Sequence, residues 1–515
     1  MSNRTTNKIP LEPDEYSILV ISDIHLGEDV SEEIQDNSNK YIKALNDELA
    51  LFVNSHTSFS SDGHQWHLVI NGDMFDFTRE QEPNLEEALE RWIQREEIQA
   101  SETAQGLEDT DAPKPASLTH FETRLSLLRI LEVHRPLFTE LGRFLCAGNK
   151  LTMINGNHDA EFYFEDMQDI LRGFICSEAE KLNEPGSLTI EQIAGAISFQ
   201  QWFEASPSFY HLEHGHQYDE LCSFEHQLVP LDHSRAKAVA TPMSHKILPY
   251  FAGVLRDFST HGVDTWTMTD WIKYILGHGP RLLGLMIAMY IGAMWELLSN
   301  AGRKRQKQMG ELRQTQGELL EELSKHTHYD LDTLVRLDSL KSPPAEYSIS
   351  KMMNVFFLDR ILLTFLSASV FLIALFIGGL AGTILGTGTL LGAIFFSWLL
   401  GKKNSSDIAE DLRRGAAQIA AVTGVQYVVF GHSHEPEILN LAKQVGSLGP
   451  FYVNSGSWVT REILRGEEGT GMTFVEIKKT GVVLKQWLGT KQAAAILAST
   501  HETKQTRPRS VSTVL

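Results

Sequence analysis

Four short motifs bring together side chains that could bind metal ions. They are SDIHLG (22–27), NGDMFD (71–76), NGNHD (155–159) and GHSH (431–434). Their carboxylate, amide and imidazole groups form a mixed oxygen and nitrogen ligand set, which suits manganese, iron or zinc. Two such ions about 3.5–4 Å apart can activate a water and neutralise a phosphoryl group. The motifs therefore predict a site for two divalent metal ions and hydrolytic chemistry.

Each motif follows a short apolar run, and the runs are 18–22, 67–71, 151–155 and 427–430. Short apolar runs bounded by turn residues are typical of strands that are buried on both faces. A single Asp-x-His or His-x-His is common in a chain with 20 histidines. The prediction therefore depends on the joint occurrence of the motifs, each after a strand.

The order of these motifs resembles that of the calcineurin-like metallophosphoesterase superfamily, whose blocks are D-x-H, G-D-x-x-D, G-N-H-D/E, H-G and G-H-x-H. The remaining block is found at His214-Gly215-His216, after a strand-like run at 209–213. A match of five blocks is highly specific. The resemblance implies an α/β fold, a four-layer α/β/β/α sandwich, and metal-dependent hydrolysis of a phosphoester or phosphoanhydride bond. It covers roughly 16–80, 145–165, 205–220 and 420–478.

The resemblance also implies which residues hold the two metal ions. Asp73 would bridge both ions, as a carboxylate with two oxygens can. The other ligands of the first ion would be Asp23, His25 and His434, and those of the second would be Asn157, His214 and His432.

Four further residues take roles around these ligands. His158 resembles the catalytic histidine that protonates the leaving oxygen or binds the phosphoryl group. Asp76 resembles the carboxylate that orients this histidine and favours its protonated form. For Asp159, a loop-fixing hydrogen bond and a role in the site are equally open. His216 is expected to support the ligands or face the substrate, and an exchange of roles with His214 is an alternative.

Among relatives, the sequences SDIHLG, GDMFD and HG look closest to the UDP-2,3-diacylglucosamine pyrophosphohydrolase type, which acts on a lipid-linked diphosphate. One sequence difference weakens the inference of the same substrate, since that type commonly has arginine where this chain has His158. The GNHD form is typical of general phosphatases and phosphodiesterases. We therefore expect a phosphorylated small-molecule substrate or a lipid-linked substrate.

Composition bears on the alternatives. The chain has 515 residues and a formal charge of −21. A nuclease-type phosphodiesterase is one alternative. Nonspecific affinity for nucleic acid comes from clustered Lys and Arg, so the negative charge of the chain counts against this alternative. A non-catalytic membrane sensor is another, and it would be expected to lack some of the ligands. The three cysteines, Cys146, Cys176 and Cys222, are irregularly spaced and fit a reducing compartment.

The uncharged stretch 361–400 predicts a transmembrane hairpin. Each half is long enough to cross a hydrocarbon core of about 30 Å. The metal-binding motifs lie on both sides of it, so the number of crossings must be even. Arg360 and Lys402-Lys403 flank it, which by the positive-inside rule favours cytosolic ends. We therefore expect a membrane protein whose catalytic domain faces the cytoplasm, with a buried soluble hairpin as the alternative. A third apolar run, 282–298, leaves the count of crossings open.

The predicted organisation has a core in two parts. The first part is 16–220, with a helical cap inserted at about 80–143. A helical insertion with the hairpin follows at 221–415, then the second part of the core at 416–490 and a polar, disordered tail at 491–515.

Overall fold

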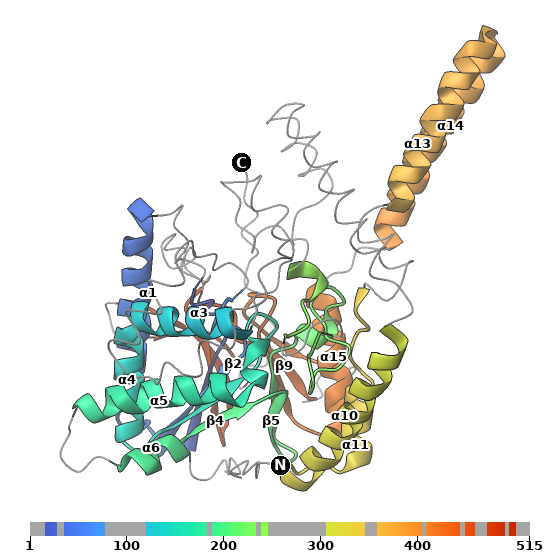
Figure 1. Ribbon diagram of the computed structural model, residues 1–515. Coiled ribbons are helices and arrows are strands. Elements are labelled where there is room, and N and C mark those ends of the chain that lie inside the picture. The colour runs from blue at the N-terminus through green and yellow to red at the C-terminus, as the bar shows by residue number, and fades with distance from the viewer. Residues whose placement is uncertain are drawn as a thin grey trace.

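The computed structural model describes eleven ranges of the chain. They are 16–27, 35–77, 120–182, 188–232, 238–245, 305–345, 358–403, 408–442, 449–458, 471–489 and 494–500. These ranges form two mixed β-sheets with helices on their outer faces (Figure 1). The mixed α/β class predicted from the sequence is therefore confirmed.

The larger sheet has seven strands in the order β12-β11-β10-β1-β2-β3-β4. Strands β1 to β4 are parallel to one another, and β1 pairs with β10 antiparallel on its other side. The strands are β1 (Tyr16–Ile21), β2 (Gln65–Asn71), β3 (Lys150–Ile154), β4 (Ile197–Gln200), β10 (Thr473–Lys478), β11 (Gly481–Trp487) and β12 (Ala494–Ser499).

The smaller sheet has the order β5-β6-β7-β9-β8. Its central strands β6, β7 and β9 are parallel, and Tyr210 of β6 pairs with Tyr427 of β7 across the long insertion. The insertion therefore leaves and re-enters the fold at neighbouring strands. The strands are β5 (Phe203–Ser206), β6 (Tyr210–Glu213), β7 (Tyr427–Phe430), β8 (Glu437–Asn440) and β9 (Phe451–Asn454).

The strands bury both of their faces because alternate side chains enter different cores. In β1, Ile18 and Val20 join a cluster shared with strands of the smaller sheet, whereas Leu19 and Ile21 join a cluster shared with helices. Successive side chains of a strand point to opposite faces of the sheet. The two sheets therefore pack face to face, and each turns its other face to helices.

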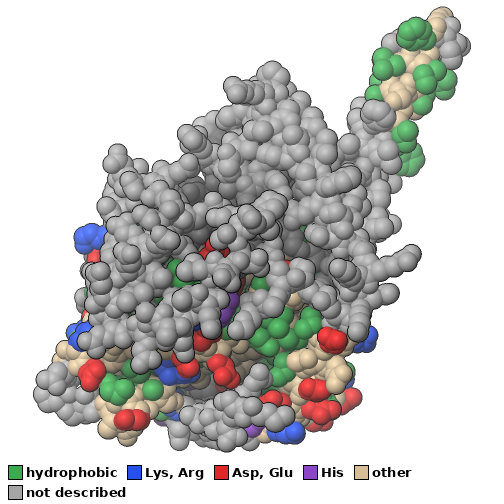
Figure 2. All heavy atoms as spheres, viewed as in Figure 1, with side chains coloured by type: hydrophobic (Ala, Val, Ile, Leu, Met, Phe, Trp, Pro, Cys, Tyr) green, Lys and Arg blue, Asp and Glu red, His purple; other side chains and the backbone are tan. Residues whose placement is uncertain are grey.

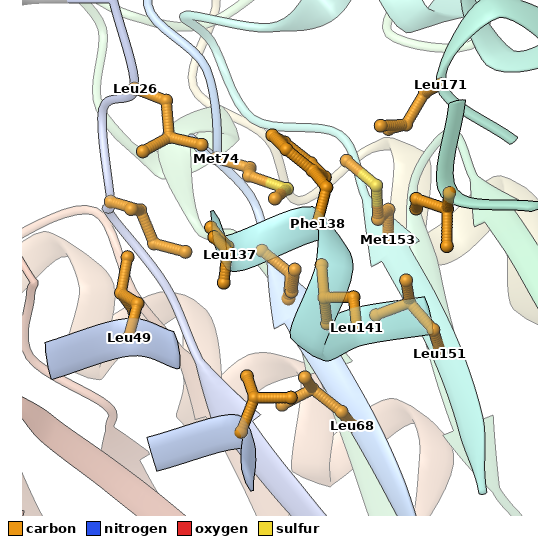
Figure 3. Close-up of a cluster of buried hydrophobic side chains, with 14 of the residues drawn as sticks. Leu26, Leu49, Leu68, Met74, Leu137, Phe138, Leu141, Leu151, Met153 and Leu171 are labelled. Atoms are coloured by element: carbon orange, nitrogen blue, oxygen red, sulfur yellow. The ribbon is translucent and has the colours of Figure 1, made fainter. Parts of the chain in front are cut away.

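Helices on the outer face of the larger sheet carry apolar side chains into its core. In α4, Leu137, Phe138 and Leu141 lie among Leu68 of β2 and Leu151 of β3 (Figure 3). The helices on this side are α1 (Gln35–Ser55), α3 (His120–Val133), α4 (Arg135–Cys146), α5 (Glu165–Leu182) and α6 (Ile190–Gly195). The smaller sheet is covered by α10 (Arg305–His326), α11 (Leu331–Asp338) and α15 (Ile408–Thr423).

The predicted cap at about 80–143 is only partly described. Residues 120–143 are helical as expected, in α3 and α4, but both helices are part of the main core. Residues 80–119 of the predicted cap lie outside the described residues.

The predicted transmembrane hairpin is wrong. Residues 361–400 belong to α13 (Leu358–Ile377) and α14 (Gly379–Lys403), which pack against each other and project from the sheets, with apolar side chains along the hairpin (Figures 1 and 2). Within the described ranges, however, none of the helices combines the length and the apolar character that a bilayer crossing requires. The uncharged run divides at Gly378 and Gly379, which both have a positive φ, and glycine and threonine recur throughout α14.

The membrane location and the cytoplasm-facing catalytic domain were deduced from that hairpin, and they are wrong on the same finding. The third apolar run, 282–298, lies outside the described residues. The predicted tail at 491–515 also differs from the structure, because Ala494–Ser499 forms β12 and pairs with β11. Residues 491–493 and 501–515 of that tail are outside the described ranges.

Candidate metal centre

The metal-binding motifs follow the carboxyl ends of β1, β2, β3, β6 and β7. Backbone hydrogen bonds join the loops that carry them: His25 N donates to Asp73 O at 3.0 Å, and Gly431 N donates to His214 O at 3.0 Å. The loop after β9 is joined as well, since Trp458 N donates to Asp23 O at 3.0 Å. The two sheets therefore present their motifs as one connected group of loops.

Several predicted ligands have an unusual backbone conformation. Among the described non-glycine residues, seven have a positive φ, and five of these are predicted ligands. Such conformations are uncommon, although Asp and His adopt them more readily than most residues, and they cluster at functional sites. The ligands concerned are Asp23, His25, Asp73, His432 and His434, with φ between 52° and 66°.

Asp23, His25 and His434 form a first group, in which the ligand atoms all lie within 4.8 Å of one another. His434 Nε2 is 3.2 Å from Asp23 Oδ1, and His25 Nε2 is 3.9 Å from the same oxygen. The other oxygen of Asp23 accepts a hydrogen bond from His432 N at 3.0 Å. Asp23 Oδ1 therefore faces the two imidazoles, and these are the three residues predicted for the first ion.

Asp73, His214 and His432 form a second group by the same criterion. His214 Nε2 is 3.1 Å from Asp73 Oδ2, and its Nδ1 is 2.9 Å from Asn71 O. Because a carbonyl oxygen only accepts, Nδ1 carries the hydrogen of that bond. The ring thus directs Nε2 into the group, as metal-binding histidines do when a carbonyl fixes their orientation.

Asp73 is shared by the two groups through one oxygen. Its Oδ2 lies 3.1 Å from His214 Nε2 and 3.9 Å from His25 Nε2. Its Oδ1 accepts a hydrogen bond from His158 N at 2.9 Å. The sequence suggests a bridge through both carboxylate oxygens, but in the structure only Oδ2 faces both groups.

Asn157 lies next to this junction. Its Oδ1 is buried and has no hydrogen-bond partner among the described residues, while its Nδ2 is 3.3 Å from His245 Nε2. The preceding Gly156 packs directly on Asp73, since a Cβ at that position would overlap Asp73 Oδ1. The amide thus presents a buried oxygen without a partner among the described residues, on the loop that packs on the shared carboxylate, and a metal ion could bind this oxygen.

His158 and Asp76 are brought together as an ion pair. His158 Nδ1 is 3.3 Å from Asp76 Oδ1, and these two residues form a third cluster with His25. The carboxylate is fully buried, whereas the side chain of His158 is 12% exposed. The pair therefore holds one imidazole beside the first group with an edge open to solvent.

Asp159 and His216 lie close to the site in different roles. Asp159 accepts hydrogen bonds from Gly156 N at 2.7 Å and Met74 N at 2.8 Å, so both oxygens are used in joining two loops. His216 belongs to none of the metal-ligand clusters in the described ranges, and its Nε2 is 2.8 Å from Gln217 Nε2. The geometry therefore favours His214 over His216 as the ligand.

Two residues near the second group were missed by the sequence analysis. Asp219 Oδ2 lies 3.1 Å from His432 Nε2, and these two residues form a fourth cluster with Cys222. His245 Nε2 lies 3.3 Å from His158 Nε2, with the ring centroids 4.2 Å apart. The three-residue spacing of His216, Asp219 and Cys222 is a weak signal that could have been followed. His245, in the long insertion, has no sequence signal.

Burial and charge oppose each other in this cluster. Burial favours the neutral form of a carboxyl, yet His434 and His214 hold the pKa of Asp23 well below its usual value. Burial lowers the pKa of His25, but Asp76, Asp73 and Asp23 together raise it to about 9. The pKa of His214 is raised to about 10 against burial by Asp73 and Asp23. The aspartates thus attract positive charge, and a metal ion would have to displace the protons of these histidines.

The residues present fit metal ions. Buried clusters of histidine with aspartate could hold them. Asn157 Oδ1 is buried without a hydrogen-bond partner among the described residues. Buried polar atoms of a folded protein normally have such a partner. Asp23 Oδ1 and His214 Nε2 are also buried, and each faces an oppositely charged partner, His434 Nε2 at 3.2 Å and Asp73 Oδ2 at 3.1 Å, with which it could share a metal ion.

Comparison of the chain with family models, curated proteins and solved structures finds no match in any of the three.

Proposed function

We propose that this protein is a dinuclear metal-dependent hydrolase of phosphoester or phosphoanhydride bonds, of the calcineurin-like metallophosphoesterase type. The observation that carries the proposal is the position of Asp73 Oδ2, within 4 Å of both His25 and His214. A carboxylate between two His/Asp groups is what a pair of neighbouring metal ions needs as a bridge. Two sheets packed face to face between helices agree with the α/β/β/α sandwich that the resemblance implies.

The proposed ions are divalent manganese, iron or zinc, since the donors are imidazole, carboxylate and amide. When bound, such a pair lowers the pKa of a water and neutralises phosphoryl oxygens. The first ion would be held by Asp23, His25 and His434. The second would be held by Asn157, His214 and His432, with Asp73 shared by both.

The protein's own part in the reaction falls to His158. His158 Nδ1 faces Asp76 Oδ1 at 3.3 Å, and its other ring nitrogen, Nε2, lies 3.3 Å from His245 Nε2. A protonated imidazole in this position can donate a hydrogen bond to a phosphoryl oxygen and then give its proton to the leaving oxygen. Asp76 holds the ring.

The substrate proposed is a small phosphoester or phosphoanhydride. A lipid-linked substrate was inferred from membrane attachment, and it loses that support together with the hairpin. The nuclease and the non-catalytic sensor have no comparable observation in their favour.

The test is metal content and hydrolysis by the purified full-length protein. After removal of metals with a chelator, the protein would be reloaded with Mn²⁺, Fe²⁺ or Zn²⁺ and assayed on phosphomonoesters, phosphodiesters, nucleoside diphosphates and DNA. We expect two metal ions per chain and hydrolysis of at least one small substrate. The exposed surface variant Asp169→Asn, whose carboxylate is 72% exposed, is the control for purification and loading. Failure to bind metal, or binding without hydrolysis of any of these substrates, would overturn the proposal.

A further inference from the structure

The two groups of ligands differ in where their supporting contacts come from. In the first group, Asp23 is held by a hydrogen bond from His432 N, and His25 lies beside Asp76. These supports belong to the motifs themselves. In the second group, His432 and Asn157 are contacted by residues of a different part of the chain, here called the post-β6 segment (216–232 and 238–245).

Asp219 fixes the orientation of His432. Its Oδ2 lies 3.1 Å from His432 Nε2, and its Oδ1 accepts a hydrogen bond from Leu221 N at 2.9 Å. Both side chains are more than nine-tenths buried. An ionised carboxylate only accepts, so His432 Nε2 must carry the proton. Nδ1 is then left as the ring nitrogen with a lone pair, which is the form a metal ion requires.

His245 fixes the orientation of Asn157. Its Nε2 is 3.3 Å from the amide nitrogen, Nδ2, which can only donate. With Nδ2 held in this way, the amide turns Oδ1 to the other side, where it is buried and without a hydrogen-bond partner among the described residues. The reverse orientation would put the amide hydrogens where Oδ1 now lies and remove the proposed oxygen ligand. His245 also touches His158, with 3.3 Å between their Nε2 atoms.

The post-β6 segment is itself held together by several contacts. Leu231 and Val239 form a β-bridge, and Ser244 N donates to Leu221 O at 3.0 Å. Phe224 and Val239 pack on Ala160, in the turn that follows the NGNHD motif. Asp219 and His245 are therefore brought to the second group by one connected unit.

We propose that the post-β6 segment is a dedicated support of the second metal site, in which Asp219 sets the tautomer of His432 and His245 sets the amide orientation of Asn157. Both are positioning residues, since they act through ligands. The inference rests on the proposed function, and it implies that the affinity of one metal ion is set separately from that of the other.

The experiment measures binding of Mn²⁺ alone to the chelator-treated full-length protein, by calorimetry and by electron paramagnetic resonance of the spin-coupled pair. In His245→Ala and in Asp219→Ala, we expect one of the two ions to bind about 10–100-fold more weakly, the usual effect of losing such a support. The other ion should bind as in the unmodified protein. The spin-coupled signal should be lost at Mn²⁺ concentrations that fill only one site.

Conservative variants separate positioning from folding. Gln at position 245 supplies an oxygen in place of the ring nitrogen, and Asn at position 219 keeps a side-chain oxygen. Each can accept the same hydrogen bond, so His245→Gln and Asp219→Asn should restore part of the lost affinity. Glu220→Gln is the matched control, because it changes the side chain next to Asp219 and keeps its size, and it should bind two ions normally. Equal weakening of both ions, or no weakening in either alanine variant, would overturn the inference while the proposed function stands. An unmodified protein that binds no Mn²⁺ would overturn both.

Discussion

The two groups of proposed metal ligands are supported by different parts of the chain. Asp23, His25 and His434 come from two motifs and are held mainly by other motif residues. Asn157, His214 and His432 also depend on Asp219 and His245, which arrive with the post-β6 segment. Asp73 lies between the groups and is shared by both.

Two groups of similar chemistry can therefore depend on different numbers of supporting segments. The first group should be largely complete once the strand-end loops have folded. The second needs, in addition, a segment that is remote in sequence from most of its ligands. Four changes to the chain should affect the two groups to different extents, from loss of both proposed ions to almost no change.

Asp73→Asn should impair metal binding by both groups. The change takes one anionic ligand from both, so we expect loss of both metal ions and of nearly all hydrolytic activity. The fold should persist, since β2 before it is apolar and buried. Metal content by mass spectrometry and circular dichroism check these two expectations. Near-normal turnover with two bound ions would contradict the assignment of Asp73 as the bridge.

His158→Ala should reduce hydrolysis without loss of either metal ion. His158 is assigned to neither ion, so metal content should stay close to two per chain. Turnover should fall by about 10²–10⁴-fold, as is usual for loss of a general acid, and most for substrates with poor leaving groups. A series of aryl phosphates of graded leaving-group pKa measures this. If the metal content falls as far as the turnover does, His158 is a ligand and its catalytic role is wrong.

Gly72→Ala should damage one group selectively. Gly72 has a φ of +87°, and a Cβ there would collide with the His214 ring. The ring must move, so the second ion should bind about 10–100-fold more weakly, on the scale of a disturbed ligand support. The first ion should be retained. Gly63→Ala has a similar positive φ with open space around it and is the matched control for backbone strain. Equal weakening of both ions would show that the groups are not separable.

Removal of the α13–α14 hairpin should have the smallest effect. Replacing 358–403 by a short flexible linker takes away none of the proposed ligands or supports. Hydrolysis of a small water-soluble substrate should therefore stay within about twofold, since surface changes away from a site usually cost little. Steady-state kinetics and metal titration measure this. Loss of either metal ion would place the hairpin among the supports of the centre.

Much of this arrangement could be predicted from residues near one another in sequence. The apolar run at 427–430 coincides with β7, and the run at 67–71 lies within β2. Each predicted ligand directly follows such a strand, or lies within a few residues of its end. Parallel strands then bring those ends together, so motif order was enough to indicate which side chains meet.

The parts that could not be predicted depend on contacts between distant segments. His245 is 87 residues from His158, and nothing in its neighbourhood marks it as part of the site. The transmembrane prediction for 361–400 fails for a different reason, because absence of charge alone does not make a helix apolar enough to cross a bilayer, and glycine and threonine recur in α14. The strand at Ala494–Ser499 contains Ile496 and Leu497, but it adjoins the polar end of the chain and lies at the edge of the sheet, so its apolar residues alone do not mark it as a strand.

A left-handed backbone conformation lowers stability, and it occurs at five proposed ligands, Asp23, His25, Asp73, His432 and His434. Selection for the proposed activity and selection for stability therefore oppose each other at these positions. Non-glycine residues in sparsely populated backbone regions cost on the order of 1–3 kcal/mol each. A domain's whole margin against unfolding is about 5–15 kcal/mol. Glycine at any of these five positions would relieve the backbone and delete a ligand at once. In relatives that no longer use the proposed metal site, substitution by glycine at these positions would increase stability. Such substitutions should therefore be among the first changes in relatives that have lost the proposed activity.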